Sequence, residues 1–302
     1  EGSLWLALTR GYSAVDVYRP AGGALGPAIV VSPVEPSRSV DGGPGVAVIK
    51  GSYPYLSVAA AADGQLAFGD GRRVGLVSAD GVVRTLAGSP RLPDSVNDAY
   101  GYSVAMRRGQ LLAGAPRAHL AFAPPEHTGA ATSEVRGVAS TRQTVLQMTP
   151  ARERSRYGTA LAWLGEEHAA VGPANGCLWL TPGACTDDAE GRAGELQVNP
   201  IRLYHHFDAG HWRQWAELPL PDVVPRAGYG SALAAEGPWL VAGAPEWDYR
   251  PQRRATHGAM LGLGRVFVYD LATLDADGDT MPDAWEQRFG LDPLDPSDAM
   301  LD

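Results

Sequence analysis

The sequence lacks any run of about 18 apolar residues, and it contains only two cysteines in 302 residues. A membrane-spanning helix needs about 20 consecutive apolar residues, so no segment is predicted to cross a membrane as a helix. The cysteines, Cys177 and Cys185, flank a segment that can turn at Pro182-Gly183. This spacing favours a disulfide that closes a small loop, and two free thiols are the alternative.

Lysine is almost absent, because Lys50 is the only one and arginine supplies the other basic side chains. Acidic residues outnumber basic ones by 34 to 25, which gives a formal net charge of −9. This sign argues against sequence-independent binding to nucleic acid or to anionic lipid. The excess is local, since residues 275–302 hold nine acids and one arginine. Abundant arginine, alanine and glycine are typical of a bacterium with a GC-rich genome.

Glycine and proline are plentiful, with 37 and 24 residues respectively. Long helices cannot accommodate so many of them, whereas short strands joined by turns can. The composition therefore predicts an all-β fold in a chain that is long enough to bury a sizeable core.

A short motif recurs along the chain, and each copy predicts one β-hairpin. A copy begins with Tyr-Gly and a strand of small and apolar residues, and its second strand ends in Gly-Ala-Pro or Gly-Pro. The clear copies are residues 100–116, 157–173 and 229–245, and an eroded copy spans 55–69. In the clear copies the two glycines are 13 or 14 residues apart, so the hairpin has a nearly fixed length.

Further strands follow the hairpins. Residues 201–204 and 264–269 predict third strands, and the alternating pattern of 211–218 predicts a fourth. A single twisted four-stranded sheet cannot bury its faces alone, whereas sheets repeated around an axis bury one another. The pattern therefore predicts a β-propeller. Residues 1–35 form a partial copy without a first strand and the last copy lacks a fourth, so the two ends are expected to complete one blade.

The repeated hairpin resembles the FG-GAP repeat of integrin α-subunit propellers and of many bacterial surface proteins. The resemblance rests on Tyr-Gly-Tyr-Ser-Val-Ala at 100–105 with Leu-Leu-Ala-Gly-Ala-Pro at 111–116, and it covers about residues 50–270. It implies a propeller of about five four-stranded blades over residues 1–271. Calcium loops inside the blades are not implied, because the connections between first and second strands are short and poor in carboxylates.

The acidic C-terminus contains a 12-residue pattern of oxygen-bearing groups, residues 275–286. Carboxylates stand at positions 1, 3, 5, 9 and 12, and a backbone carbonyl is available at position 7. This is the ligand spacing of an EF-hand-type calcium site, because calcium takes six to eight oxygens and alternate carboxylates in a turn can converge on one ion. Thr280 stands at position 6, where an EF-hand has glycine. The predicted ligands are Asp275, Asp277, Asp279, Met281, Asp283 and Glu286.

This loop resembles those of thrombospondin type-3 repeats and of related bacterial secreted proteins. Pro282 and Gly290 bracket a predicted helix over residues 283–289, with Trp285 and Phe289 on one face. A calcium-binding module is therefore expected at 272–302, and it is expected to continue past this segment as part of a larger chain. A solvated acidic tail is the alternative.

Long inserts separate the second and third strands of the clear copies. Equivalent connections of a propeller emerge on one face, and loops on a rigid scaffold commonly carry function. The inserts contain aromatic residues and arginines of the kind enriched at binding surfaces, although packing of each insert on its neighbour is the alternative. The candidate binding residues are His119, Phe122, Trp179, Trp247, Tyr249, Arg250, Arg253 and Arg254.

No constellation in the sequence predicts catalysis. A nucleophile elbow requires a helix directly after the serine, and no helix is predicted after Ser103. His205 and His206 are adjacent on a predicted strand and point to opposite faces, which argues against a shared metal site. We therefore expect a non-catalytic binding or adhesion module that is secreted, periplasmic or exposed on the cell surface and recognises a protein partner. One alternative is a lectin-like propeller that binds a surface glycan, and a second is an accessory domain of a secreted hydrolase.

Overall fold

The computed structural model describes residues 6–10, 14–21, 24–33, 48–49, 57–60, 66–69, 73–77, 83–88, 99–107, 110–116, 130–135, 143–146, 157–165, 168–173, 199–208, 211–221, 228–245, 247 and 264–300. The chain forms two compact units, residues 1–161 and 162–302. Among the described residues, no helix is long and apolar enough to cross a membrane.

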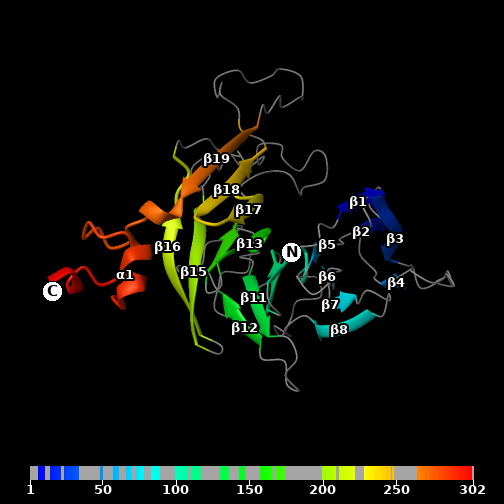
Figure 1. The fold of residues 1–302 in the computed structure, drawn as a ribbon, viewed down its shortest axis with the longest axis horizontal. Coiled ribbons are helices and arrows are strands. Elements are labelled where there is room, and N and C mark those ends of the chain that lie inside the picture. Colours follow the sequence, from blue (N-terminus) through cyan, green and yellow to red (C-terminus); the bar gives the residue numbers. More distant parts are fainter. Residues whose placement is uncertain are drawn as a thin grey trace, which may run out of the picture. The chain divides into compact units, whose positions relative to one another are not determined.

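Small, mostly antiparallel sheets make up the first unit, so the all-β prediction is confirmed (Figure 1). Its first sheet contains β1 (Leu6–Arg10), β2 (Ala14–Ala21), β3 (Ala24–Pro33) and β4 (Val48–Ile49), and β4 pairs with β3 in parallel. The second contains β5 (Ser57–Ala60), β6 (Leu66–Gly69), β7 (Arg73–Val77) and β8 (Val83–Gly88). The third contains β9 (Val104–Arg107), β10 (Gln110–Ala115), β11 (Ala130–Val135) and β12 (Gln143–Leu146).

The second unit continues this pattern. One sheet contains β13 (Ala160–Leu164), inside which the boundary between the units falls, β14 (His168–Gly172), β15 (Ile201–Asp208) and β16 (His211–Leu218). The last contains β17 (Ala232–Glu236), β18 (Trp239–Ala244) and β19 (Arg265–Asp270), and it is three-stranded within the described residues, as the sequence predicts. The short helices η1 (Leu271–Thr273), α1 (Asp283–Phe289) and η2 (Asp298–Met300) follow.

Every hairpin that the motif predicts is present: β5–β6, β9–β10, β13–β14 and β17–β18. In the three clear copies the glycine of Tyr-Gly has a positive φ, 78° at Gly101, 88° at Gly158 and 79° at Gly230. Only glycine adopts this left-handed conformation without a steric cost. The amide of Gly101 donates to the carbonyl of Gly114 at 2.8 Å, and Gly230 donates to Gly243 at 3.0 Å. The motif therefore encodes a tight entry into the hairpin.

Consecutive repeats also contact one another at a second recurring position, the glycine of the second strand. A Cβ added at Gly69, Gly114 or Gly172, all in second strands, would overlap the carbonyl oxygen of the following Tyr-Gly glycine, which is Gly101, Gly158 and Gly230 respectively. Serine hydroxyls support two of these contacts, because Ser57 Oγ donates to Gly101 O at 2.6 Å and Ser103 Oγ to Gly158 O at 2.9 Å. Ser103 is thus part of the repeat framework.

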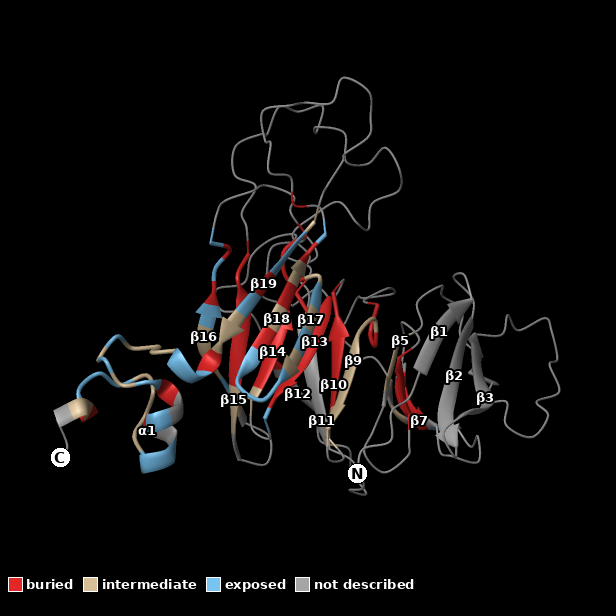
Figure 2. Cartoon of the chain, turned by 45° about the horizontal axis from the view of Figure 1, so that its top comes forward, coloured by how far each residue is buried: buried red, intermediate tan, exposed pale blue. Residues whose placement is uncertain are grey.

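Neighbouring sheets of each unit share a core. In the first unit, Ala67, Val74 and Leu76 pack with Tyr100 and Leu111. In the second unit, the buried cluster runs from β13 through β18 to Leu271 of η1 (Figure 2). Its members include Leu164, Ile201, Leu203, Leu218, Tyr229, Leu240, Trp247, Phe267 and Leu271.

The acidic C-terminal segment is attached to this second core. Leu274 packs against the cluster, and the Leu271 amide donates to the carbonyl of Pro238 at 2.8 Å. The Asp283 amide donates to Leu274 O at 2.7 Å, which brings the start of α1 back to the base of the loop. Helix α1 has the predicted bounds, and Gly290, with a φ of 80°, ends it. The loop is therefore held at both ends before any ion is considered.

Candidate metal centre

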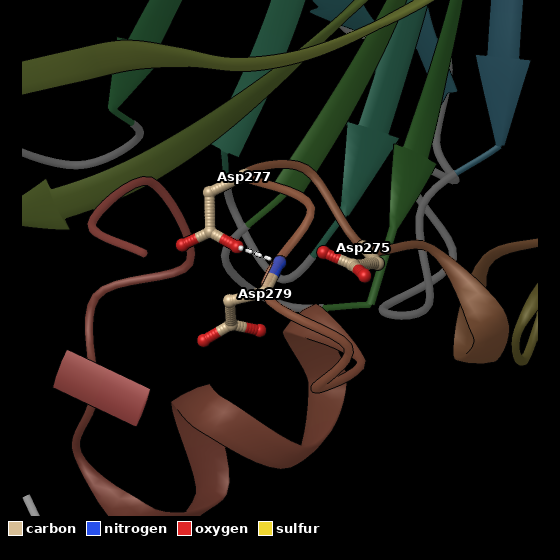
Figure 3. A group of neighbouring side chains, drawn as sticks. All are labelled: Asp275, Asp277 and Asp279. Carbon is tan, nitrogen blue, oxygen red and sulfur yellow. Dashed lines mark hydrogen bonds between the residues drawn. The ribbon is translucent and has the colours of Figure 1, made fainter. Parts of the chain in front are cut away.

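Aspartate side chains organise the loop through hydrogen bonds to its own backbone. Asp275 accepts from the amides of Gly278 at 2.7 Å and Thr280 at 3.0 Å. Asp277 accepts from the Asp279 amide at 3.2 Å, the contact drawn in Figure 3, and Asp279 accepts from Met281 at 2.7 Å. These short side chains bond to nearby amides in turns, so the loop curls around its own carboxylates.

Two overlapping groups of carboxylates result. Asp275, Asp277 and Asp279 each place one oxygen within 4.8 Å of the others, and Figure 3 shows these three side chains along the loop. A second group of the same compactness consists of Asp279, Glu286 and Asp298. Asp279 belongs to both groups, so the loop, helix α1 and the turn η2 all contribute to one continuous acidic centre.

Several oxygens of this centre are buried without a hydrogen-bond partner among the described residues. Asp283 and Glu286 are completely buried, and Asp298 is 8% exposed. A buried carboxylate that lacks a partner is costly, because desolvation disfavours the charge. The oxygens in question are Asp277 Oδ2, Asp279 Oδ2, Glu286 Oε1, Glu286 Oε2 and Asp298 Oδ1.

The acids also disturb one another's ionisation. The pKa of Glu286 is raised to about 7, first by burial and then by the neighbouring negative charges of Asp277, Asp279, Asp283 and Asp298. Burial likewise raises the pKa of Asp283 to about 6, and Asp275 and Asp277 contribute to the increase. The pKa of Asp277 is raised for the same reasons, burial first. A positive ion in the centre would offset these shifts, because it favours the charged form of each carboxylate.

The centre can hold a hard metal cation. Calcium–oxygen distances of 2.3–2.6 Å allow two ligands on one ion to be at most about 5 Å apart, which matches the two groups. The donors are carboxylate oxygens, which suit calcium, magnesium or manganese rather than softer metals. Magnesium usually keeps several waters, whereas a set of carboxylates from five side chains is typical of calcium.

The structure places four of the predicted ligands in the two groups and adds Asp298 to the second group. Asp275, Asp277 and Asp279 form the first group, and Glu286 of α1 belongs to the second. The buried Asp283 belongs to neither group, and its side chain accepts a hydrogen bond from the Ala276 amide at 2.7 Å. The Met281 amide is fixed by Asp279. Asp298 was not among the predicted ligands, because its place in the acidic run carries no loop spacing. Only the return of residues 291–298 to α1 reveals it.

The candidate binding residues are placed very differently. Trp247 is 4% exposed and lies in the core of the second unit, edge-on to Phe267 with a centroid distance of 5.3 Å. Its side chain stabilises the scaffold, and the guanidinium of Arg265 lies 4.8 Å from its ring centroid. The other candidates and both cysteines lie outside the described residues: His119, Phe122, Trp179, Tyr249, Arg250, Arg253, Arg254, Cys177 and Cys185.

A histidine pair links strands β14 and β15. His205 Nδ1 of β15 lies 2.6 Å from His168 Nε2 of β14, and the Trp215 ring lies 4.8 Å from that of His168. The pKa of His168 is lowered to about 4, first by burial and second by the neighbouring His205. His206 instead packs on Trp212, so the adjacent histidines have different surroundings. His168 is therefore neutral near pH 7, and its contact with His205 joins β14 to β15.

Known proteins show little similarity to this chain. No protein-family model and no curated protein matches the chain. Among solved structures, the chain is similar to the extracellular domain of a one-component system from B. thetaiotaomicron, with a TM-score of 0.27, 9% identity and coverage of 78% of this chain and 31% of that one. It is also similar to a chain of the mitotic checkpoint complex, with a TM-score of 0.23, 13% identity and coverage of 80% and 79%. The chain thus spans about a third of the first neighbour, and such low scores bear on neither fold nor function.

Proposed function

We propose that this chain is a non-catalytic binding module of a secreted or surface-exposed protein and that its C-terminal segment binds a structural calcium ion. The observation that carries the calcium proposal is the set of buried carboxylate oxygens that lack hydrogen-bond partners among the described residues. Loop spacing and the two compact groups support the same conclusion. The ion would neutralise carboxylates that otherwise repel one another.

The sheets are, in this proposal, blades of an FG-GAP-type propeller of about five blades. Two observations support it: each motif copy forms the same hairpin, and second-strand glycines meet the next Tyr-Gly carbonyl in the same way each time. A regular contact between successive repeats is what stacked units of a repeat protein require. The scaffold would present the inserts between second and third strands to a protein partner.

The calcium proposal is tested on the full chain by isothermal titration after treatment with a chelator. Asp279→Asn removes the carboxylate that both groups share, yet its amide oxygen can still accept from Met281. We expect calcium binding to weaken by roughly a hundredfold or to vanish, because the ion would lose its central charged ligand. Glu236→Gln, at an exposed acid of the β17–β18 turn, is the matched control and should bind as the wild type does. Equal binding by Asp279→Asn and wild type would refute the site.

A further inference from the structure

We infer that Asp298 is a ligand of the same cation as the 275–286 loop, so that the ion holds residues 291–300 closed against helix α1. This inference rests on the proposed calcium function and extends it, because it takes the site beyond the contiguous loop. It predicts that binding of the ion and ordering of residues 291–300 occur together.

Asp298 lies beside two of the predicted ligands. Its carboxylate lies within 4.8 Å of ligand oxygens of Asp279 and Glu286, a separation that two ligands of one calcium ion can have. Glu286 is fully buried, and neither of its oxygens has a hydrogen-bond partner among the described residues. Such a side chain, directed at other acids, requires a positive ion to offset its desolvation.

The two carboxylate oxygens of Asp298 have different roles. Oδ2 accepts from the Asp292 amide at 2.7 Å, which folds residues 292–298 into a compact turn. Oδ1 is buried and has no partner among the described residues. One oxygen therefore shapes the segment while the other is left available for the cation.

Without the ion, the interactions that hold residues 291–300 against helix α1 are weak. The Leu291 amide donates to Glu286 O at 2.9 Å, and Arg213 of β16 pairs with Asp292 at 3.1 Å, but that ion pair is exposed and exposed pairs contribute little. Closure also brings the Asp298 charge beside Asp279 and Glu286, and like charges in a buried space repel strongly. A cation reverses the sign of this interaction. Because Asp292 contacts both Asp298 and Arg213, closure also seats the segment on β16.

The test uses the full chain and compares Asp298→Asn with Asp295→Asn. The first substitution keeps an acceptor for the Asp292 amide and removes the charge at the ion. The second removes an equal charge from the same segment at an exposed residue whose side chain accepts hydrogen bonds from Ser297. Calcium affinity is measured by titration calorimetry, and the closure of residues 291–300 is followed by hydrogen exchange with and without calcium.

We expect Asp298→Asn to weaken calcium binding by roughly tenfold or more, as loss of a charged ligand does, and Asp295→Asn to change it less than about threefold. Calcium should slow exchange in residues 291–300 of the wild type and of Asp295→Asn, but not of Asp298→Asn. Exchange in β15 and β16 should be the same in all three, which shows that the variants are folded. If Asp298→Asn bound calcium with wild-type affinity while Asp279→Asn did not bind it, this inference would be overturned and the calcium proposal would stand. Absence of calcium binding by the wild type would overturn both proposals.

Discussion

At the scale of single residues, the acidic loop contains a departure from the EF-hand pattern that has a physical cost. Thr280 has a φ of 83°, a left-handed conformation that a β-branched residue adopts only under strain. Its amide nevertheless donates to Asp275 at 3.0 Å, so the hydrogen bonds of the loop hold it there. The sequence showed that glycine was missing at this position, whereas only the structure shows that the left-handed turn is kept without it.

Replacing Thr280 by glycine should therefore stabilise the loop. Relief of strain outweighs the greater freedom that glycine has in the unfolded chain, and we expect a gain of about 1 kcal/mol. Hydrogen exchange of residues 276–286 would then slow by about fivefold in the calcium-free protein. Thr273→Gly is the matched control, because Thr273 lies in η1 without a positive φ, and it should not slow this exchange. Faster exchange in Thr280→Gly than in the wild type would contradict the interpretation.

At the scale of elements, the hairpin and its contact with the next repeat form the structural unit. The second-strand glycine leaves room for the carbonyl of the following Tyr-Gly, so that two backbones approach closely. The last repeat differs: among the described residues a Cβ at Gly243 would meet only Ala232, at 3.4 Å from its Cβ and 3.8 Å from its carbonyl oxygen. The same motif position thus has different consequences in different repeats.

The pair Gly114→Ala and Gly243→Ala tests this difference. A methyl group at Gly114 would overlap the Gly158 carbonyl and the Ser103 hydroxyl, and the backbone can yield only by separating the repeats. We expect a loss of about 3 kcal/mol in the free energy of unfolding for Gly114→Ala and less than about 1 kcal/mol for Gly243→Ala. Urea unfolding followed by circular dichroism measures both. Similar losses for the two variants would show that the contact between repeats does not limit stability.

At the scale of the whole molecule, the charge is divided between a nearly neutral sheet scaffold and a strongly acidic C-terminal segment. The segment is joined to the core of the second unit through Leu271 and Leu274. An ion that binds only the folded segment stabilises it by mass action, by about 2.7 kcal/mol when free calcium is 100 times the dissociation constant. One calcium ion would offset two of these negative charges, so the segment would stay acidic with the ion bound.

Calcium should accordingly raise the midpoint of thermal unfolding, and a chelator should lower it again. The shift is expected in the wild type and in Glu236→Gln, and it should disappear in Asp279→Asn because that variant lacks the shared ligand. Differential scanning calorimetry with calcium or with excess chelator measures it. A shift of the same size in Asp279→Asn would mean that calcium stabilises the chain at another place.

The sequence by itself determined the hairpins and helix α1, because their signals are local. Tyr-Gly with small residues set the hairpins, and Pro282 with Gly290 set the bounds of α1. The spacing of Asp275, Asp277 and Asp279 also predicted their convergence, since residues of one turn are close in any folded state. Local patterns therefore gave the strand order within each hairpin and most of the acidic centre.

Tertiary structure alone decided which distant groups meet. Trp247 looked like a binding residue, yet its packing on Phe267 from β19 buries it. Asp298 looked like one acid of a tail, yet the turn of residues 291–298 returns it to Glu286. The pairing of His168 with His205 follows from the register of β14 on β15. Burial and proximity of residues far apart in the chain depend on how the elements pack, and no periodicity of the sequence encodes that.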